Sequence, residues 1–510
     1  MPAREPFPRA VLDVLGAAGD RPVFEHGTRV VTGTALLDLV ARIATGWRRR
    51  GIGPGDGLAL LLGVNVEAFA TILAGHVVGA RVVGVRPGLT DAQVAHLLGL
   101  DITAVVTDGT AVVGGTAVVG GGAAVGGGAA VGGGAAVGGG AAVGGANGPL
   151  TRLAVEDLLA HSPGLPDSPD PLRCDGRPGD IARLIHTSGS TGAPKACAQT
   201  YASMTDSWTA HPEAWPPAIR DLATRLGRYL VFGSLSSQVM FEYAVLTLTA
   251  GGTIVVADDP ATAITDLKAT ARVITVPGLA KLVAAQQESP ADLSSLRALL
   301  VSGSPLTPDR HREALETLGP VLFHGYGQTE TGMISMATPD DPPGTVGKPP
   351  VDVEVRDGEL FVRTPGQACG YWGDPEQSAE VFADGWVRTR DLGRFDAFGY
   401  LRLTGRARDV VIVNATLHYI GPIEQVIAEH PDVAEAYVVA VPDDETGEAP
   451  HAFVVPRDRA PGLQELQRLV TERLGAASAP RKVTAITEVP VAPSGKPDKR
   501  ELRRRSCPAR

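Results

Sequence analysis

A chain of 510 residues is too long for one ordinary hydrophobic core, so we expect at least two domains. Its net charge of −10, from 46 basic and 56 acidic residues, argues against nucleic acid or an anionic membrane as the main partner. The four cysteines show no metal or disulfide spacing, and we see neither a secretion signal nor a bilayer-spanning stretch, so we expect a globular protein of the cytoplasm. No pattern indicates an oligomeric state.

Short apolar runs alternate with helical patterns through the first part of the chain. Helical periodicity covers residues 36–49, and buried strands are expected at 57–62, 80–85, 103–107, 181–186, 229–232, 253–257, 273–276 and 298–302. Strands that alternate with helices predict parallel sheets covered by helices, the α/β fold class. Residues 354–403 then become strand-rich, with glycine and aspartate turns, which predicts a compact β subdomain.

The pattern changes once more beyond residue 408. It predicts a small α+β unit of about one hundred residues, within the usual size of a separate domain. Its expected strands are 410–413, 433–441 and 451–456, and its expected helices are 421–429 and 463–474. We therefore expect an N-terminal domain at residues 1–405 and a small C-terminal domain at 409–510, linked at 404–409.

Residues 111–146 repeat the hexad Ala-Ala-Val-Gly-Gly-Gly in tandem. Glycine at this density carries a large entropic cost of ordering, and alanine and valine bury little area in return. We interpret the tract as a mobile surface insertion without chemistry of its own. A short glycine-rich solenoid is the alternative.

A loop rich in hydroxyls and glycines follows the expected strand at 181–186. Glycines let the backbone approach an anion, hydroxyls and turn N–H groups donate to phosphate oxygens, and a lysine adds positive charge. The glycines stand too close together for the G-x-x-x-x-G-K-[ST] motif, so the loop is either a phosphate loop of another kind or a solvated connection. Its residues of interest are Thr187, Ser188, Gly189, Ser190, Thr191, Gly192 and Lys195.

Three more segments carry the residue types that a magnesium nucleotide needs. Residues 323–332 offer the ring of Tyr326 for stacking and the carboxylate of Glu330 as a hard oxygen ligand. Asp391, which we place at a turn, can accept from ribose hydroxyls, and Lys496 stands on a tight turn near the C-terminus. Taken singly, these four residues have alternative explanations as packing, helix-end charge, turn residue and solvated lysine.

The joint occurrence of these motifs, in this order over about residues 20–505, resembles the acyl-activating, adenylate-forming superfamily. That superfamily contains acyl-CoA synthetases, aryl-CoA ligases, luciferases and peptide-synthetase adenylation domains. The resemblance implies a ligase that uses ATP and Mg²⁺ to adenylate a carboxylic acid, releases pyrophosphate and passes the acyl group to an acceptor, most often coenzyme A. It also implies that the C-terminal domain rotates between the two half-reactions.

Each matching residue has a role that the resemblance implies. Thr187 to Lys195 resembles the phosphate loop, Tyr326 the adenine-stacking aromatic, Thr329 the phosphate-contacting hydroxyl, Glu330 the magnesium ligand, Asp391 the ribose-binding aspartate, Arg406 the arginine beside it, and Arg408 the hinge residue. Lys496 matches the lysine that bridges the carboxylate and the α-phosphate during adenylation. Gly303, Gly325 and Gly327 belong to the same nucleotide-binding segments.

Two segments depart from the family pattern. An ungapped comparison puts Asn414-Ala415 where relatives that use coenzyme A commonly carry a glycine pair. Asparagine tolerates the left-handed conformation, so the turn can persist, but an alanine methyl narrows the path for pantetheine. Residues 232–241 lack the histidine or aromatic that many relatives place at the acid pocket, and their polar residues favour a small or polar acid. The expected pocket residues are Ser236, Ser237, Gln238, Phe241 and His324.

Three functions follow as hypotheses. The first is adenylation of a small or aromatic acid and transfer to coenzyme A. The second is a ligase of specialised metabolism with a non-thiol acceptor, such as a diazotase that activates nitrite and couples it to an aromatic amine. The third is a nucleotide-binding protein without turnover, against which the presence of Lys195, Glu330, Asp391 and Lys496 argues.

Overall fold

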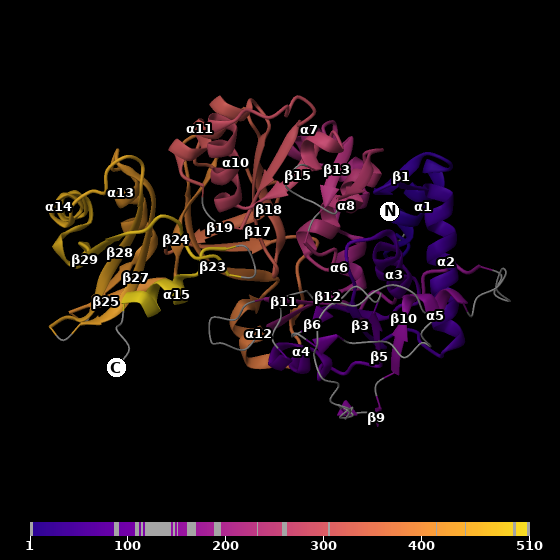
Figure 1. Ribbon diagram of the computed structural model, residues 1–510. Coiled ribbons are helices and arrows are strands. Elements are labelled where there is room, and N and C mark those ends of the chain that lie inside the picture. The colour runs from indigo at the N-terminus through magenta and orange to yellow at the C-terminus, as the bar shows by residue number, and fades with distance from the viewer. Residues whose placement is uncertain are drawn as a thin grey trace, which may run out of the picture. The chain divides into compact units, whose positions relative to one another are not determined.

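Two units interleaved along the chain make up the computed structural model (Figure 1). The first unit comprises Met1–Trp215, Leu226–Ala263 and Ala368–Pro375, and the second comprises Pro216–Arg225, Ile264–Gln367 and Glu376–Arg510. The structure describes residues 4–85, 91–107, 112–113, 116–117, 144–145, 148–149, 151–160, 170–187, 195–231, 233–257, 263–303, 306–414, 416–443, 445–492 and 496–506.

The first unit contains a seven-stranded sheet of order β10-β5-β3-β4-β11-β12-β21. Its first five strands pair in parallel and the last two pairs are antiparallel. The central strand β3 is buried along its whole length, which is typical of a parallel strand covered on both faces. The strand bounds are β3 Gly57–Leu61, β4 Arg81–Gly84, β5 Ala104–Thr107, β10 Thr151–Ala154, β11 Ile181–Thr187, β12 Lys195–Thr200 and β21 Gly370–Tyr371.

Four further strands of the first unit are neighbours in the order β13-β14-β1-β2, with bounds β1 Pro22–His26, β2 Arg29–Thr32, β13 Arg228–Val231 and β14 Thr253–Val256. Helices α2 and α3 begin where the side chains of Thr32 and Asn65 accept from backbone N–H groups. The helices of this unit are α1 Arg9–Ala18, α2 Gly33–Arg49, α3 Val66–Val77, α4 Asp91–Leu98, α5 Val155–Ala160, α6 Tyr201–Thr205 and α8 Gln238–Thr249.

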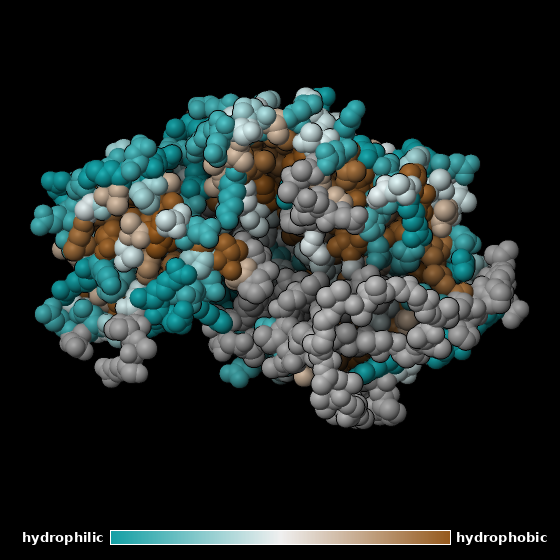
Figure 2. Space-filling model, in the orientation of Figure 1, coloured by the Kyte–Doolittle hydropathy of each residue, from teal (hydrophilic) through white to brown (hydrophobic). Residues whose placement is uncertain are grey.

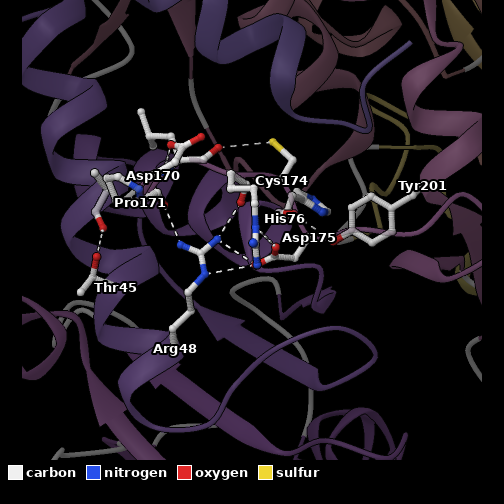
Figure 3. A network of polar contacts seen from close by, with 11 residues as sticks. Thr45, Arg48, His76, Asp170, Pro171, Cys174, Asp175 and Tyr201 are labelled. Atoms are coloured by element: carbon white, nitrogen blue, oxygen red, sulfur yellow. Dashed lines mark hydrogen bonds and ion pairs between the residues drawn. The ribbon is translucent and has the colours of Figure 1, made fainter. Parts of the chain in front are cut away.

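A partly buried polar network holds residues 170–175 against helix α2, and the backbone N–H of Asp175 donates to the carbonyl of Val77 on α3 at 2.8 Å (Figure 3). Arg48 of α2 donates to the carbonyl of Pro171 at 2.7 Å and pairs with Asp175 at 2.9 Å. Tyr201 donates to the carbonyl of His76 on α3 at 3.2 Å. Burial, reinforced by the charge of Arg183, lowers the pKa of the His76 imidazole to about 3, so this side chain is neutral in the folded protein near neutral pH.

The second unit contains four strands in the order β18-β17-β16-β15, with the last three parallel and β18 antiparallel to β17. Helix α11 buries His311 and Ala314 only, and the surface over it is mostly hydrophilic (Figure 2). The bounds are α7 Pro217–Ala223, β15 Ala271–Ile274, α10 Val276–Glu288, β16 Ala298–Val301, α11 Pro308–Leu318, β17 Leu322–Gln328 and β18 Gly332–Ala337. The short helix α9, Ala263–Asp266, lies at the unit boundary.

A five-stranded antiparallel sheet of order β19-β20-β23-β22, with β24 on β23, forms the β subdomain expected at 354–403. Its core contains Leu360, Val362 and Leu401 together with Tyr326 of β17. The bounds are β19 Asp352–Arg356, β20 Glu359–Arg363, α12 Pro375–Val381, β22 Phe382–Ala383, β23 Trp386–Phe395 and β24 Leu401–Arg406.

The last part of the second unit has a sheet of its own, of order β26-β25-β28-β27 with β29 parallel to β28. Helices α13 and α14 contribute Ile423, Ile427, Leu466 and Val470 to its core. The bounds are β25 Val410–Val413, β26 Thr416–Tyr419, α13 Ile420–Ala428, β27 Val433–Asp443, β28 Gly447–Pro456, α14 Leu463–Leu474, β29 Lys482–Ala485 and α15 Lys499–Ser506. Arg310 of α11 pairs with Glu435 of β27 at 2.7 Å.

The structure confirms the α/β fold with a separate C-terminal sheet, and most expected strands and helices agree within about two residues. The expected turn position of Asp391 is wrong, because this residue lies inside strand β23. Residues 404–406 of the expected link belong to strand β24. Most of the tract 111–146 lies outside the described residues, so its interpretation is untested. No helix in the described part of the chain is both long and apolar enough to cross a membrane.

Candidate active site

Asp391 is the centre of a buried hydrogen-bond network in the second unit. Tyr326 Oη donates to Asp391 Oδ2 at 2.9 Å, and Gln328 Nε2 donates to the same oxygen at 2.6 Å. Arg406 Nε lies 3.0 Å from Asp391 Oδ1, because β23 and β24 pair these two residues across the sheet. Asp391 is 5% exposed, whereas the Arg406 side chain is 57% exposed. The network therefore opens to solvent on its guanidinium side.

The electrostatics of this network keep the Tyr326 phenol and the Arg406 guanidinium protonated. Burial and the charge of Asp391 raise the pKa of Tyr326 well above its ordinary value, so the phenol stays a donor. The charge of Asp391 also raises the pKa of Arg406. The Asp391 side chain accepts from Tyr326 and Gln328 and pairs with Arg406. A group of this kind can accept from the hydroxyls of a ligand.

Thr329 and Glu330 lie in the turn of the hairpin formed by β17 and β18, and both are half-buried. Close backbone packing fixes this hairpin, since a Cβ atom on Gly327 would overlap the carbonyl oxygen of Gly332. Thr331 Oγ1 accepts from the backbone N–H of Gln328 at 3.2 Å, which ties the two sides of the turn together. The hairpin therefore holds the Thr329 hydroxyl and the Glu330 carboxylate one and two residues beyond Gln328, whose amide donates to Asp391.

Lys496 and Gly303 are brought together from distant parts of the second unit. Gly303 follows β16 with φ of +94°, a conformation that favours glycine. A Cβ atom built on it would lie 3.4 Å from Lys496 Cε, so the stem of the lysine lies along this glycine. Ala492 N donates to Lys496 O at 2.8 Å, and Val491 pairs with Pro497.

The candidate hinge residue Arg408 lies in the turn that follows β24. Its guanidinium is 3.5 Å from Glu380 Oε1, and Arg390 lies 2.6 Å from the same oxygen. The guanidinium of Arg390, followed by those of Arg408 and Arg388, lowers the pKa of Glu380 against the opposing effect of desolvation. Asn414, which directly follows β25, has φ of +50°, so asparagine adopts the left-handed conformation in the turn after that strand. Ala415 lies outside the described residues.

The expected phosphate loop belongs to the first unit, and its residues 188–194 lie outside the described residues. What the structure describes is its base, where Thr187 ends β11 and pairs with Lys195 at the start of the antiparallel strand β12. Lys195 Nζ lies 4.9 Å from the ring centroid of Tyr371. The loop thus connects two antiparallel strands, and Lys195 is the first residue of the second strand.

The expected pocket residues lie in two different places. Ser236 and Ser237 precede α8, where Ser236 packs directly against Gly84 of β4. Phe241 is buried between the rings of Phe7 and Phe69, at centroid distances of 6.3 and 5.8 Å. His324 belongs to the second unit, where its Nδ1 lies 3.2 Å from the carbonyl oxygen of Thr345.

A buried ion pair beside these serines was not expected from the sequence. Arg183 of β11 lies 3.1 Å from Glu242 of α8, and Gln238 donates to the same Glu242 oxygen at 2.9 Å. Gln199 on the neighbouring strand accepts from Arg183 Nε. The only sequence signal was a charged residue inside an apolar strand. The other missed residue, Gln328, lies within the motif that supplied Tyr326 and Glu330.

Three comparisons with known proteins show which family the chain belongs to. The family model for the AMP-binding enzyme matches residues 13–372, and that for the AMP-binding enzyme C-terminal domain matches residues 422–496. Feruloyl-CoA synthase of Amycolatopsis sp is 30% identical over 94% of this chain and 95% of its own length. The medium/long-chain-fatty-acid–CoA ligase FadD8 of Mycobacterium tuberculosis is 29% identical over 95% and 87%. The structure of the amide bond synthetase McbA from Marinactinospora thermotolerans covers 98% of this chain and 99% of its own, with 31% identity and a TM-score of 0.77.

Proposed function

Because the chain belongs to the AMP-binding enzyme family and is an ATP-dependent adenylate-forming ligase, we propose that it activates a small or aromatic carboxylic acid and passes the acyl group to the thiol of coenzyme A. In the first half-reaction a carboxylate oxygen bonds to the α-phosphorus of ATP, and the bond from that phosphorus to the bridging oxygen breaks to release pyrophosphate. In the second half-reaction the thiol sulfur attacks the acyl carbon and AMP leaves.

The observation that carries this proposal is the network around Asp391. Ribose hydroxyls are donors, and Asp391 is a buried carboxylate whose remaining partner, Arg406, stands at the solvent side. The ring of Tyr326 on β17 is fixed by its hydrogen bond to the Asp391 carboxylate on β23, so strands of two different sheets hold an aromatic ring beside the proposed ribose acceptor. Preorganised groups of this kind position a nucleotide without loss of further conformational entropy.

Charge neutralisation is the second requirement, because a carboxylate must approach a polyphosphate. We assign this role to Lys496, whose stem lies along Gly303, and to Mg²⁺ held by Glu330. Within the described ranges no group of three or more acidic, histidine or cysteine side chains could hold a metal ion. A single carboxylate nevertheless fits Mg²⁺, since phosphate oxygens and waters complete its shell. When bound, the ion neutralises the charge of the phosphates.

The substrate class rests on the residues that precede and begin α8. Ser236, Ser237 and Gln238 are polar, and the Arg183–Glu242 pair lies directly behind Gln238. A long alkyl chain would leave such groups without partners, which costs binding energy. We therefore place a small or aromatic acid in this pocket, in line with the aromatic acid named in one of the relatives.

The test is pyrophosphate release from ATP with a panel of acids: ferulate, benzoate, indoleacetate and octanoate. The proposal expects release that depends on one of the first three acids and on Mg²⁺, followed by formation of its CoA thioester. Faster release with octanoate would refute the substrate class. Absence of release with every acid would favour a nucleotide-binding protein without turnover.

An amine acceptor is the second candidate, because two observations favour it. The amide bond synthetase structure matches nearly the whole of both chains. Asn414 also stands where relatives that use coenzyme A commonly carry glycine. The same assay with an aromatic amine in place of coenzyme A, and with nitrite in place of the acid, distinguishes thioester, amide and diazo products. Thioester formation alone would exclude this candidate.

We also propose that residues 404–409 act as the hinge between an N-terminal domain, 1–405, and a mobile C-terminal domain, 409–510, with Arg408 as its pivot. Arg408→Pro restricts one backbone angle and is expected to slow acyl transfer more than adenylation. The two steps are measured separately as pyrophosphate release and as product formation from the purified adenylate. Equal slowing of both steps would count against a hinge here.

A further inference from the structure

Lys499 is held between two carboxylates, although it belongs to a basic tail whose other cations are mostly exposed. Its Nζ lies 2.9 Å from Glu424 Oε1 on α13 and 3.3 Å from Asp409 Oδ2 at the end of the hinge segment. Glu424 Oε1 also accepts from the backbone N–H of Val438 at 2.6 Å. The Lys499 side chain is 32% exposed, against 76% for Arg504 on the same helix.

The same lysine is separated from Lys496 by only two residues, and both of these are fixed. Pro497 pairs with Val491, and the backbone N–H of Asp498 donates to the carbonyl of Pro490 at 2.7 Å. Asp498 Oδ1 in turn accepts from the backbone N–H groups of the residues that follow Lys499 on α15, at 3.1 Å each. Only two residues, both held by backbone contacts to residues 490–491, therefore lie between Lys499 and Lys496.

We propose that Lys499 is a positioning residue for adenylation: by pairing with Asp409 and Glu424 it fixes the segment whose Lys496 stem lies along Gly303. The inference rests on the proposed function, in which Lys496 acts on the carboxylate and the α-phosphate. Without the ammonium group nothing ties this segment to Asp409 and Glu424, and the two carboxylates left without their cation also weaken the fold. The segment moves, and the lysine three residues upstream loses its alignment with the reacting atoms.

The test compares Lys499→Met with Arg500→Met, its exposed neighbour, in the full chain with whichever panel acid the wild-type enzyme turns over. We expect Lys499→Met to lower kcat for pyrophosphate release about tenfold to a hundredfold, with KM for ATP changed less than about threefold. Arg500→Met keeps the wild-type kcat, and Lys499→Arg restores most of it. In a Lys496→Ala background, Lys499→Met should cause no further loss.

A stability measurement separates positioning from a general weakening of the fold. Lys499→Met/Glu424→Gln removes one carboxylate charge together with the cation, so its thermal midpoint should recover toward wild type while kcat stays low. Recovery of kcat along with the midpoint, an unchanged kcat in Lys499→Met, or an equal loss in the Lys496→Ala background would each overturn the inference. A wild-type enzyme inactive with the whole panel refutes the proposed function itself, and this inference with it.

Discussion

One ion pair in each unit differs from the other in how far its members are exposed, and the difference bears on what each region can bind. In the second unit the Asp391 carboxylate is buried but its partner Arg406 is largely exposed. In the first unit Arg183 and Glu242 are only 11% and 18% exposed, and the amides of Gln199 and Gln238 complete their hydrogen bonds. We call the Asp391–Arg406 pair open, because its exposed partner can give way to a ligand. We call the Arg183–Glu242 pair closed, because both of its members are largely shielded from solvent.

The energetic consequences of the two arrangements differ accordingly. Removing one member of a closed pair leaves a charge in a poorly solvated place and destabilises the fold by about 3 kcal/mol. Removing one member of the open pair is buffered by water on the guanidinium side, so ligand binding suffers more than folding. We therefore expect changes around Asp391 to act on the nucleotide and changes around Arg183 to act on stability and on the choice of acid.

The largest expected effect comes from Lys496→Ala. If the second unit neutralises the reacting phosphate, kcat for pyrophosphate release should fall about a hundredfold to a thousandfold with every acid, because a preorganised cation is lost. KM for ATP should change little. Lys482→Ala, on the edge strand β29, is the control and should keep the wild-type rate. Acid-dependent pyrophosphate exchange at the wild-type rate in Lys496→Ala would contradict this assignment.

Asp391→Asn should weaken nucleotide binding more than it weakens folding. The amide presents N–H groups toward Tyr326 and Gln328, which are donors themselves, so the acceptor for ribose is lost. KM for ATP is expected to rise about tenfold to a hundredfold, the range for a lost charge-assisted hydrogen bond. Asp396→Asn, in a turn of the same sheet, is the matched control. An unchanged KM for ATP would place the nucleotide elsewhere.

Arg183→Met should lower stability and change the preference among acids, while nucleotide binding stays nearly constant. It removes the cation of the closed pair, so the free energy of unfolding should fall by about 3 kcal/mol, measured in urea. Relative rates among ferulate, benzoate and indoleacetate should also change, while KM for ATP stays within about threefold. The exposed Arg152→Met is the control. A shift in KM for ATP without any change in acid preference would remove the distinction between the two regions.

Near neutral pH the smallest effect concerns His76, whose pKa is lowered to about 3 by burial and by the charge of Arg183. Between pH 3 and 6.5 the unfolded chain binds one more proton than the folded chain at this site. Its contribution to stability is therefore complete above pH 6.5 and declines as the pH falls, by up to about 1.4 kcal/mol per pH unit.

His76→Leu removes this titration, so its free energy of unfolding should depend less steeply on pH over that interval. Urea unfolding at several pH values measures the slope. Parallel slopes for the variant and the wild type would show that His76 is not neutral in the folded state.

Local patterns in the sequence predicted much of the molecule. The bounds of α14 were predicted without error, because its apolar residues recur at helical spacing, and Asn414 adopts the left-handed turn that its side chain tolerates. Pairings between residues far apart in the chain are not indicated by any local sequence pattern. Arg183 and Glu242 come from different elements, and their ion pair is visible only once β11 and α8 are packed.

Lys499 illustrates the same limit. In the sequence it is one of several cations near the C-terminus, for which a solvated helix surface was the natural interpretation. Its carboxylate partners come from the hinge segment and from α13, and nothing in the local pattern indicates them. Asp391 was predicted to accept from ribose hydroxyls, but its place inside a strand was not predicted, because the flanking glycines are typical of turns.

Rapid-quench mass spectrometry of wild-type enzyme with ATP, Mg²⁺ and the panel acids tests the central claim most directly. We expect the mixed anhydride of one acid with AMP to accumulate in an amount close to that of the enzyme when no acceptor is added, and not to form in Lys496→Ala. Release of ADP and phosphate in place of AMP and pyrophosphate, or an anhydride that forms equally well without Lys496, would contradict the account.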